Sequence, residues 1–278
     1  GIMNKIKLIA LDIDETILPK NNIISDRVKK TVEEAQKRGI KVLIATGRMH
    51  KSAMPVAKNL NLTSPIISYQ GAMIKNFYGN EDLIFHCPLK EEHAKKVISL
   101  LKDDDVQLNI YMDDNLYSQT ETERLQQYSA KQNIKYIITD SFDKFPKFEP
   151  TKMLAIGKDS EHTDYIVKKL KDCFNDELYL VKSSPVFCEI NNKQTSKGNA
   201  IKYLANLWGI KSEETMAIGD QNNDIEMLKS VHIKVAMGNA TDDLKHVANF
   251  ITQDIDHDGA AEAIEKFALN NEELTCTK

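Results

Sequence analysis

The stretch IKLIALDIDETIL, residues 6–18, joins a short apolar run directly to a cluster of carboxylates. Its first half, IKLIAL, is typical of a parallel β-strand that is buried on both faces. Asp12, Asp14 and Glu15 follow this run within four positions. Because an open parallel sheet binds its ligands outside the carboxyl ends of its strands, the stretch predicts a functional site at this strand end.

Similar strands alternate with helical patterns on either side of this stretch. KVLIAT at 41–46 and PIISY at 65–69 resemble the first strand, and a helix that begins after Ser25 and ends at Gly39 precedes the second. The alternation of strands and helices returns late in the chain. Helices are predicted at 197–208, from about 223 and near 259–268, and strands at 215–220 and 233–238. Both ends of the chain therefore predict one α/β fold, a doubly wound Rossmann-like parallel sheet.

The middle of the chain has a different pattern. It contains a helix at 90–102, strands between 106 and 118, and a polar helix at 121–132, with further strands and a helix up to about residue 190. Pro88 and Pro185 lie near the two changes of pattern. We therefore expect a core domain of residues 1–83 and 190–278, interrupted by an inserted α/β cap domain of residues 84–189.

The composition narrows the class of partner. The 278 residues carry a formal net charge of −4 and no long basic block, which argues against nucleic acid. No run of about 18 apolar residues is present, so we expect no membrane span and a cytoplasmic protein. The cysteines form no CxxC pair and the histidines no HxH or HxxxH pair, which favours a hard, oxygen-bound cation for any metal.

Polar residues follow each predicted core strand. Thr46 and Gly47 come after the second strand, Asp220 and Asp224 follow the apolar segment TMAIG of the strand at 215–220, and Lys197 begins a helix after the insertion. These groups would meet Asp12 and Asp14 in one crevice at the edge of the sheet. Four carboxylates repel one another there unless a divalent cation or protonation offsets their charge. Mg²⁺ is the natural ion for carboxylate and phosphate oxygens.

This set of groups fits phosphoryl transfer. One carboxylate can attack phosphorus, and a second can protonate the leaving oxygen and then activate water, which are the roles that we assign to Asp12 and Asp14. Lys197, the Thr46 hydroxyl and the amides of its loop can hold the phosphate.

Taken singly, each motif has an ordinary structural explanation. DIDET can be a solvated loop, Asp220 and Asp224 can cap a helix, Lys197 can be a surface lysine, and Thr46-Gly47 can be a plain turn. Their order along the chain and their placement at strand ends make that coincidence improbable.

In these motifs the chain resembles a haloacid dehalogenase (HAD) superfamily phosphatase. The four superfamily motifs correspond to DIDET at 12–16, Thr46 in ATGR, Lys197 in SKGNA, and GDQNND at 219–224. SYQGA at 68–72 and HDGAAEAI at 257–264 are similar to the Cof-like, type IIB branch, which carries an α/β cap.

The resemblance implies a role for each site residue. Asp12 would be the nucleophile that forms an aspartyl-phosphate, and Asp14 the general acid and base. Mg²⁺ would be held by the side chains of Asp12 and Asp220 and the backbone carbonyl of Asp14, with Asp224 supporting it. The residues that hold the phosphate would be Thr46, Gly47, Lys197 and Asn223.

Three positions stay without a definite role. Arg48 lies in the second motif, Glu15 stands where many relatives carry Gly, and Glu189 lies near the return to the core. We expect Glu189 to serve the hinge or the structure, although an approach to substrate is the alternative.

The resemblance implies a phosphatase that acts on a small phosphorylated metabolite. Sugar phosphates are the first expectation and phosphorylated cofactors such as flavin or pyridoxal phosphate the next, in a monomer or homodimer. Two alternatives remain: a sugar phosphomutase, and a non-catalytic regulatory protein that accepts phosphate. The acid at Asp14 and the large insertion argue against the second.

Overall fold

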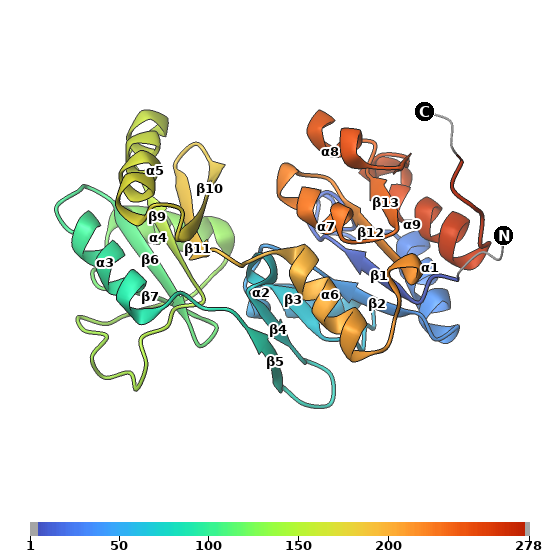
Figure 1. Ribbon diagram of the computed structural model, residues 1–278, viewed down its shortest axis with the longest axis horizontal. Coiled ribbons are helices and arrows are strands. Elements are labelled where there is room, and N and C mark those ends of the chain that lie inside the picture. The colour runs from blue at the N-terminus through green and yellow to red at the C-terminus, as the bar shows by residue number, and fades with distance from the viewer. Residues whose placement is uncertain (1–4, 276–278) are drawn as a thin grey trace. The chain divides into compact units, whose positions relative to one another are not determined.

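The computed structural model describes residues 5–275 and divides the chain into two compact units (Figure 1). The core unit contains the residues up to Phe85 and those from Ser196 onward, and the inserted unit contains His86–Thr195. Our expected boundary at 189 falls inside the strand β11 (Phe187–Asn192), whose pairing partners β9 and β10 also lie in the inserted unit.

The core unit is built on a parallel sheet, which confirms the predicted doubly wound α/β fold. Among the described residues this sheet has five strands, in the order β14 (Phe250–Ile251), β13 (Ile233–Ala236), β12 (Thr215–Gly219), β1 (Leu8–Leu11) and β2 (Lys41–Ile44). The chain leaves β1 for β2 on one side and later returns to β12 on the other. The carboxyl ends of β1 and β12 therefore lie at the switch point of the sheet, where α/β proteins bind ligands.

Burial explains why residues 8–11 form an interior strand of this sheet, β1. All four residues of β1 and all five of β12 are buried, as expected for strands covered by helices on both faces. Leu11 pairs with Ile218 of β12 and with Ile44 of β2, so three strands end level with one another. The residues that follow these strands are thereby brought to one edge of the sheet.

Helices of the core unit pack in two groups. In one, α1 (Asp26–Lys37) packs against α9 (Gly259–Ile264), and in the other α6 (Lys197–Leu207) packs against α7 (Ile225–Lys229). The predicted cap of α1 is present, since the Ser25 side chain accepts a hydrogen bond from Val28 N. The helix predicted near 259–268 continues past α9 as a π-helical turn, Glu265–Leu269.

Several core features were not predicted from the sequence. They are α2 (His50–Asn59), α8 (Asp242–Val247), β14, β4 (Met73–Lys75) and β5 (Leu83–His86). The strand predicted at 65–69 is present as β3 (Ile66–Ser68), but it pairs antiparallel with β4 in a separate sheet and meets the end of β2 at an isolated parallel bridge between Ala45 and Ile67. Pro55 lies inside α2 and signals a helix break in a sequence pattern. The remaining elements are short, and short segments show little periodicity.

The inserted unit has its own sheet and its own core. Its strands have the order β10 (Leu178–Ser184), β11, β9 (Lys152–Ile156), β6 (Gln107–Met112), β7 (Asn115–Ser118) and β8 (Tyr136–Ile138). Apolar side chains of α3 (Glu91–Leu101) and α5 (Ser160–Phe174) bury one face of this sheet. On the other face, Tyr128 of α4 (Glu123–Gln132) contacts Tyr111 and Phe187.

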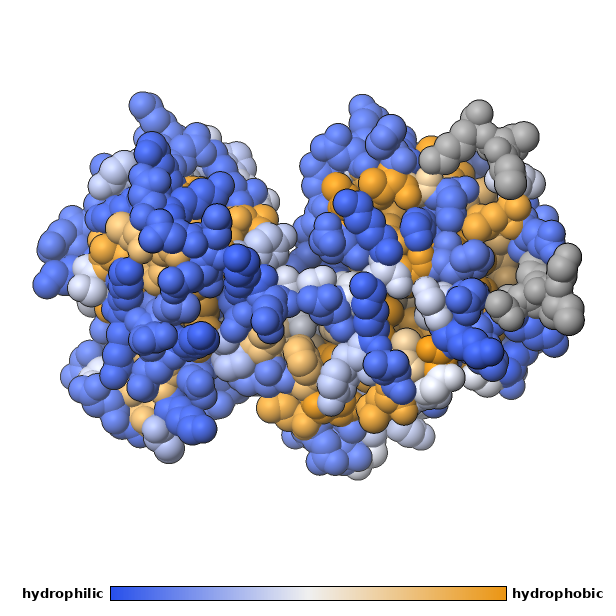
Figure 2. All heavy atoms as spheres, viewed as in Figure 1, coloured by the Kyte–Doolittle hydropathy of each residue, from blue (hydrophilic) through white to orange (hydrophobic). Residues whose placement is uncertain are grey.

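The face of the molecule drawn in Figure 2 is largely hydrophilic, with apolar residues showing between the polar ones. Between residues 5 and 275, no helix is both long enough and apolar enough to cross a membrane.

Candidate active site

Asp12 lies at the carboxyl end of β1 and is almost fully buried. Its Oδ1 accepts a hydrogen bond of 2.9 Å from Ile13 N and lies 3.3 Å from Lys197 Nζ. The chain turns sharply after this residue, because Thr16, Ile17 and Leu18 all donate from their backbone amides to Ile13 O. This turn presents Asp12 at the edge of the sheet.

Lys197 supplies the positive charge in the site. It is the first residue of α6 and its side chain is only 1% exposed. Its Nζ lies 2.7 Å from Asp224 Oδ1 as well as 3.3 Å from Asp12 Oδ1. Burial disfavours the charged amine, but the charges of Asp12 and Asp224 outweigh it and raise the pKa of Lys197 above its ordinary value.

Asp224 connects this lysine to the loop after β12. Its carboxylate is fully buried, and its Oδ2 accepts hydrogen bonds from the backbone amides of Asp220 and Gln221. A Cβ on Gly219 would lie 2.6 Å from Asp224 Oδ2, so only glycine allows the carboxylate to fold back on the strand end. Asp224 therefore shapes the loop as well as contributing charge.

Three carboxylates of the core unit form a candidate metal centre. Asp12, Asp220 and Asp224 each offer an oxygen, and these oxygens lie within 4.8 Å of one another. Asp220 is oriented by Thr16 Oγ1, which donates to its Oδ1 at 3.1 Å, and by Gln221 Nε2, which donates to its Oδ2. Thr16 was not among the residues predicted from sequence, although it lies within DIDET.

The electrostatics of this cluster favour a bound cation. Burial raises the pKa of Asp12 well above its ordinary value; the charges of Asp224 and Asp220 raise it further, while Lys197 lowers it. The pKa of Asp220 is also raised, mainly by burial and then by Asp224. Three carboxylates and one ammonium leave a formal charge of about −2, and an oxygen-rich cluster of that charge suits a hard divalent cation.

The predicted phosphate-binding residues Thr46, Gly47 and Asn223 lie in the loops that follow β2 and β12. Thr46 is buried at the end of β2, where its Oγ1 accepts a hydrogen bond of 3.1 Å from Arg48 N. Asn223 is exposed in the short turn η3 (Asn222–Asp224) and donates from Nδ2 to Gln70 Oε1 at 3.3 Å. Gly47 also approaches Gln70, since a Cβ on Gly47 would lie 3.2 Å from Gln70 Oε1.

Gln70 was not identified from the sequence as a site residue. It lies in the turn η1 (Tyr69–Gly71), inside SYQGA, a segment that supported the family resemblance without a residue role. Asn223 and Gln70 are far apart in the sequence, so only the fold reveals that they pair.

Asp14 lies outside the three-carboxylate cluster. Its side chain is 58% exposed and pairs with Arg48, whose Nε and Nη2 lie 2.9 and 2.5 Å from its two oxygens. This bidentate pair gives Arg48 a defined place in the site. Asp14 is thus a solvent-accessible carboxylate two residues beyond a buried one.

The two remaining acids have structural contacts. Glu15 has a φ of 62°, in the left-handed region that favours glycine, and its carbonyl accepts a hydrogen bond from Asn239 Nδ2. Glu189 lies 3.0 Å from Lys152 Nζ within the inserted unit. Burial of Lys152 opposes its positive charge, but the negative charge of Glu189 outweighs this effect. The pKa of Lys152 is therefore raised.

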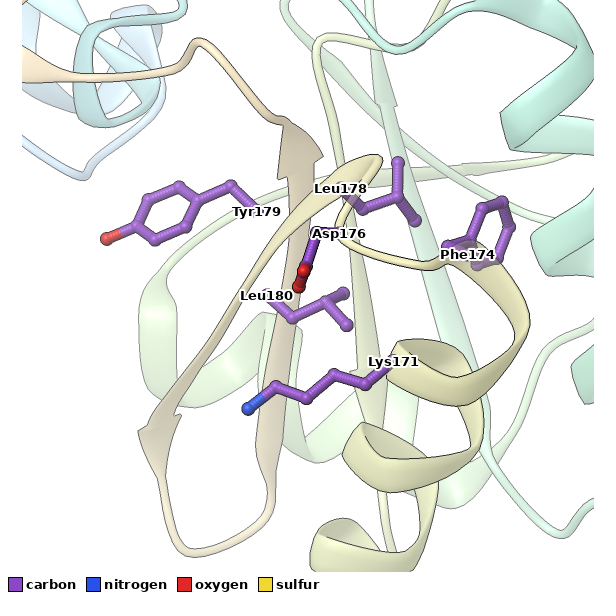
Figure 3. Close-up of a pocket in the computed structure, with 6 residues that line it drawn as sticks. All are labelled: Lys171, Phe174, Asp176, Leu178, Tyr179 and Leu180. Carbon is purple, nitrogen blue, oxygen red and sulfur yellow. The ribbon is translucent and has the colours of Figure 1, made fainter.

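A small pocket in the inserted unit lies between the end of α5 and β10 (Figure 3). It is lined by Lys171, Phe174, Asp176, Leu178, Tyr179 and Leu180. None of these residues belongs to the predicted site, and their chemistry is mainly apolar.

Comparisons with known proteins show to which family this chain belongs. The family described as haloacid dehalogenase-like hydrolase matches residues 9–264. A similar protein, the 5-amino-6-(5-phospho-D-ribitylamino)uracil phosphatase YcsE of Bacillus subtilis, is 31% identical over 267 residues, covering 95% of this chain and 96% of the relative.

Solved structures of the same superfamily are also similar. A haloacid dehalogenase-like hydrolase from Bacteroides thetaiotaomicron has a TM-score of 0.85 at 27% identity, covering 95% of this chain and 100% of that one. The HAD subclass IIB sugar phosphatase BT4131 has a TM-score of 0.79 at 27% identity, covering 95% and 99%. This chain therefore belongs to the haloacid dehalogenase-like hydrolase family, and it is an enzyme of the phosphatase type within that superfamily.

Proposed function

We propose that this enzyme hydrolyses phosphate monoesters of small, sugar-like metabolites, with Mg²⁺ as its cation and a phosphorylated Asp12 as its intermediate. The observation that carries the proposal is the buried Asp12 carboxylate, 3.3 Å from Lys197 and clustered with Asp220 and Asp224, with the exposed Asp14 two residues further on. A buried nucleophile beside a fixed ammonium and a separate, accessible acid suit a two-step hydrolysis.

The residues present fit Mg²⁺. We assign it to the side chains of Asp12 and Asp220 and to the backbone carbonyl of Asp14. Asp224 supports the site, because its oxygens already accept hydrogen bonds from Lys197 and from the amides of Asp220 and Gln221. When bound, Mg²⁺ neutralises carboxylate charge and polarises the phosphoryl oxygens.

In the first step, an Asp12 oxygen attacks phosphorus and the bond to the leaving oxygen breaks. Asp14 donates its proton to that oxygen, and Arg48 orients the Asp14 carboxyl group. In the second step, Asp14 takes a proton from water, whose oxygen attacks phosphorus. The bond from phosphorus to Asp12 then breaks and releases inorganic phosphate. Lys197, the Thr46 hydroxyl, the Gly47 amide and Asn223 hold the phosphoryl group throughout.

The proposed substrate class rests on what two relatives act on. One is named for a phosphorylated ribityl compound and the other is a sugar phosphatase, and both kinds of substrate carry phosphate on a hydroxylated carbon chain. We infer the same class for this enzyme, and we propose that the inserted unit, as a cap, selects among such chains.

The test combines turnover with trapping of the intermediate. Wild-type protein is expected to hydrolyse p-nitrophenyl phosphate with Mg²⁺ but not with EDTA. Asp12→Asn is expected to lose this turnover and also the acid-stable phosphorylation of the protein by its substrate. Asp26→Asn, which changes an exposed aspartate at the start of α1, serves as the control. Turnover by Asp12→Asn equal to wild type would refute the assigned nucleophile.

A screen of phosphorylated metabolites, ranked by kcat/KM, then tests the substrate class. Preference for hydroxylated chains is expected. Stimulation by a sugar bisphosphate without net phosphate release would instead identify a phosphomutase. Long-lived phosphorylation of the protein without turnover would identify a regulatory protein.

A further inference from the structure

We propose that Gln70 is a positioning residue that fixes the Thr46–Gly47 loop and Asn223 in the arrangement that binds the substrate phosphate. The inference rests on the proposed function, since it concerns the same phosphate site. Gln70 belongs to neither the acid cluster nor the Asp14–Arg48 pair.

The backbone of the η1 turn is tied to the loop after β2. Gln70 N donates to Thr46 O at 2.9 Å, and Tyr69 N donates to Arg48 O at the same distance. These two hydrogen bonds enclose Gly47, whose amide is one of the proposed phosphate donors. The position of that amide therefore depends on the turn.

The side chain of Gln70 is tied to the loop after β12. Its Nε2 donates to Asn223 O at 2.7 Å, and its Oε1 accepts from Asn223 Nδ2 at 3.3 Å. One amide thus holds both the backbone and the side chain of Asn223. Because Asn223 is exposed in a short turn, these contacts restrict the rotamers of its side chain.

The η1 turn also packs closely against the start of α6. A Cβ on Gly71, which has a φ of 104°, would lie 2.2 Å from Ser196 O, next to Lys197. The turn therefore contacts all three segments that carry the proposed phosphate ligands: the loop after β2, the loop after β12 and the start of α6.

The backbone conformation of the turn is itself unusual. Tyr69 and Gln70 have φ values of 51° and 61°, in the left-handed region that neither residue type favours. Asparagine suits that region better than glutamine, but its side chain is one methylene shorter. Glutamine at this position thus combines an unfavourable backbone conformation with the reach needed for Asn223 O, and strain of this kind is concentrated at functional sites.

The comparison of Gln70→Leu with Gln70→Asn separates reach from backbone preference. Both variants are expected to bind inorganic phosphate, in the presence of Mg²⁺, about tenfold more weakly than wild type, the size expected for losing one or two neutral hydrogen bonds. Gln70→Asn should unfold at or above the wild-type temperature, because it suits the left-handed backbone. Calorimetry gives the phosphate Kd, and p-nitrophenyl phosphate gives kcat and KM.

Gln36→Leu is the matched control, because Gln36 also donates from Nε2 to a backbone carbonyl, that of Asn61 at 3.0 Å, away from the site. It should leave phosphate binding unchanged. In a double-mutant cycle with Asn223→Ala, the combined loss should be smaller than the product of the single losses, since each single variant already removes the contact between Asn223 Nδ2 and Gln70 Oε1.

The role of Gln70 would be overturned if Gln70→Asn bound phosphate as tightly as the wild type. It would also be overturned if the losses of affinity in Gln70→Leu and Asn223→Ala simply multiplied in the double variant. The proposed function fails separately: a wild-type protein that binds phosphate but releases none from p-nitrophenyl phosphate refutes hydrolysis, and the phosphate Kd values still decide on Gln70. A wild-type protein that neither binds nor hydrolyses refutes both.

Discussion

Arg48 pairs with Asp14 through two parallel hydrogen bonds, of 2.9 Å from Nε to Oδ2 and 2.5 Å from Nη2 to Oδ1. The two residues belong to different loops, those that follow β2 and β1. A planar guanidinium orients a carboxylate more strictly than an ammonium can, so the direction of the Asp14 carboxyl group is set from the neighbouring loop.

Replacing Arg48 with Lys keeps the charge and removes this planar contact. We expect kcat to fall about tenfold because the acid is less well oriented, with KM changed less. The free energy of unfolding should change by less than about 1 kcal/mol, because Asp14 is exposed and Arg48 is only partly buried. Arg27→Lys is the control, since Arg27 forms a similar bidentate pair with Glu265. An unchanged kcat in Arg48→Lys would contradict the orienting role.

Replacing Lys197 with Met leaves Asp12 and Asp224 without their ammonium partner. Removing one partner of a buried pair costs about 3–5 kcal/mol, so we expect a loss of that order in the free energy of unfolding, together with loss of turnover. Mg²⁺ should restore part of the stability by offsetting the charge. Urea unfolding with Mg²⁺ or with EDTA measures this, and Lys7→Met, at an exposed lysine paired with Glu214, should cost less than about 1 kcal/mol.

Removal of divalent cation should lower the melting temperature of the wild type. A ligand at about 100 times its Kd stabilises the folded state by about 2.7 kcal/mol. Asp220→Asn should lose most of the stabilisation by Mg²⁺, because it removes one carboxylate of the cluster. Differential scanning calorimetry with Mg²⁺ and with EDTA gives both shifts. A shift in Asp220→Asn as large as that of wild type would show that the cation binds elsewhere.

His50 should make the protein sensitive to acid. Burial lowers its pKa from 6.5 to about 4, and the charge of Lys75 contributes to this shift. Between these two pKa values the unfolded state binds a proton at His50 that the folded state does not bind. The free energy of unfolding is therefore unaffected by this difference above pH 6.5 and decreases as the pH falls from 6.5 toward 4.

The His50→Gln variant tests this effect. Its stability should decline less than that of wild type between about pH 7.5 and about pH 5, measured by urea unfolding with Mg²⁺ present throughout. Parallel curves for the two proteins would exclude His50 as the source of acid sensitivity.

Gly47→Ala tests the close packing at the phosphate site. The added methyl group would lie 3.2 Å from Gln70 Oε1, so the glutamine must shift and its contacts with Asn223 weaken. We expect phosphate to bind about fivefold more weakly. Gln70→Ala removes the crowded atom, so the methyl group should cost less in that background. An equal loss in both backgrounds would place the effect of Gly47 elsewhere.

The local pattern of apolar and polar residues determines the main strands and helices of the core unit. The apolar run before Asp12 predicted a strand buried on both faces, and the alternation of strands and helices predicted the doubly wound sheet. Parallel strands end at the same edge of a sheet, so the pattern of strands was enough to predict that the residues after them lie near one another. The inserted region was visible as a change in that pattern.

The tertiary structure alone decided how the side chains of those loops pair. The sequence grouped Asp14 with the other acids, whereas the fold separates it from the cluster and pairs it with Arg48. It also buries Lys197 between two aspartates and connects Gln70 with Asn223. These contacts join residues that are distant in sequence, and they depend on the order β12, β1, β2 in the sheet, which local periodicity does not encode.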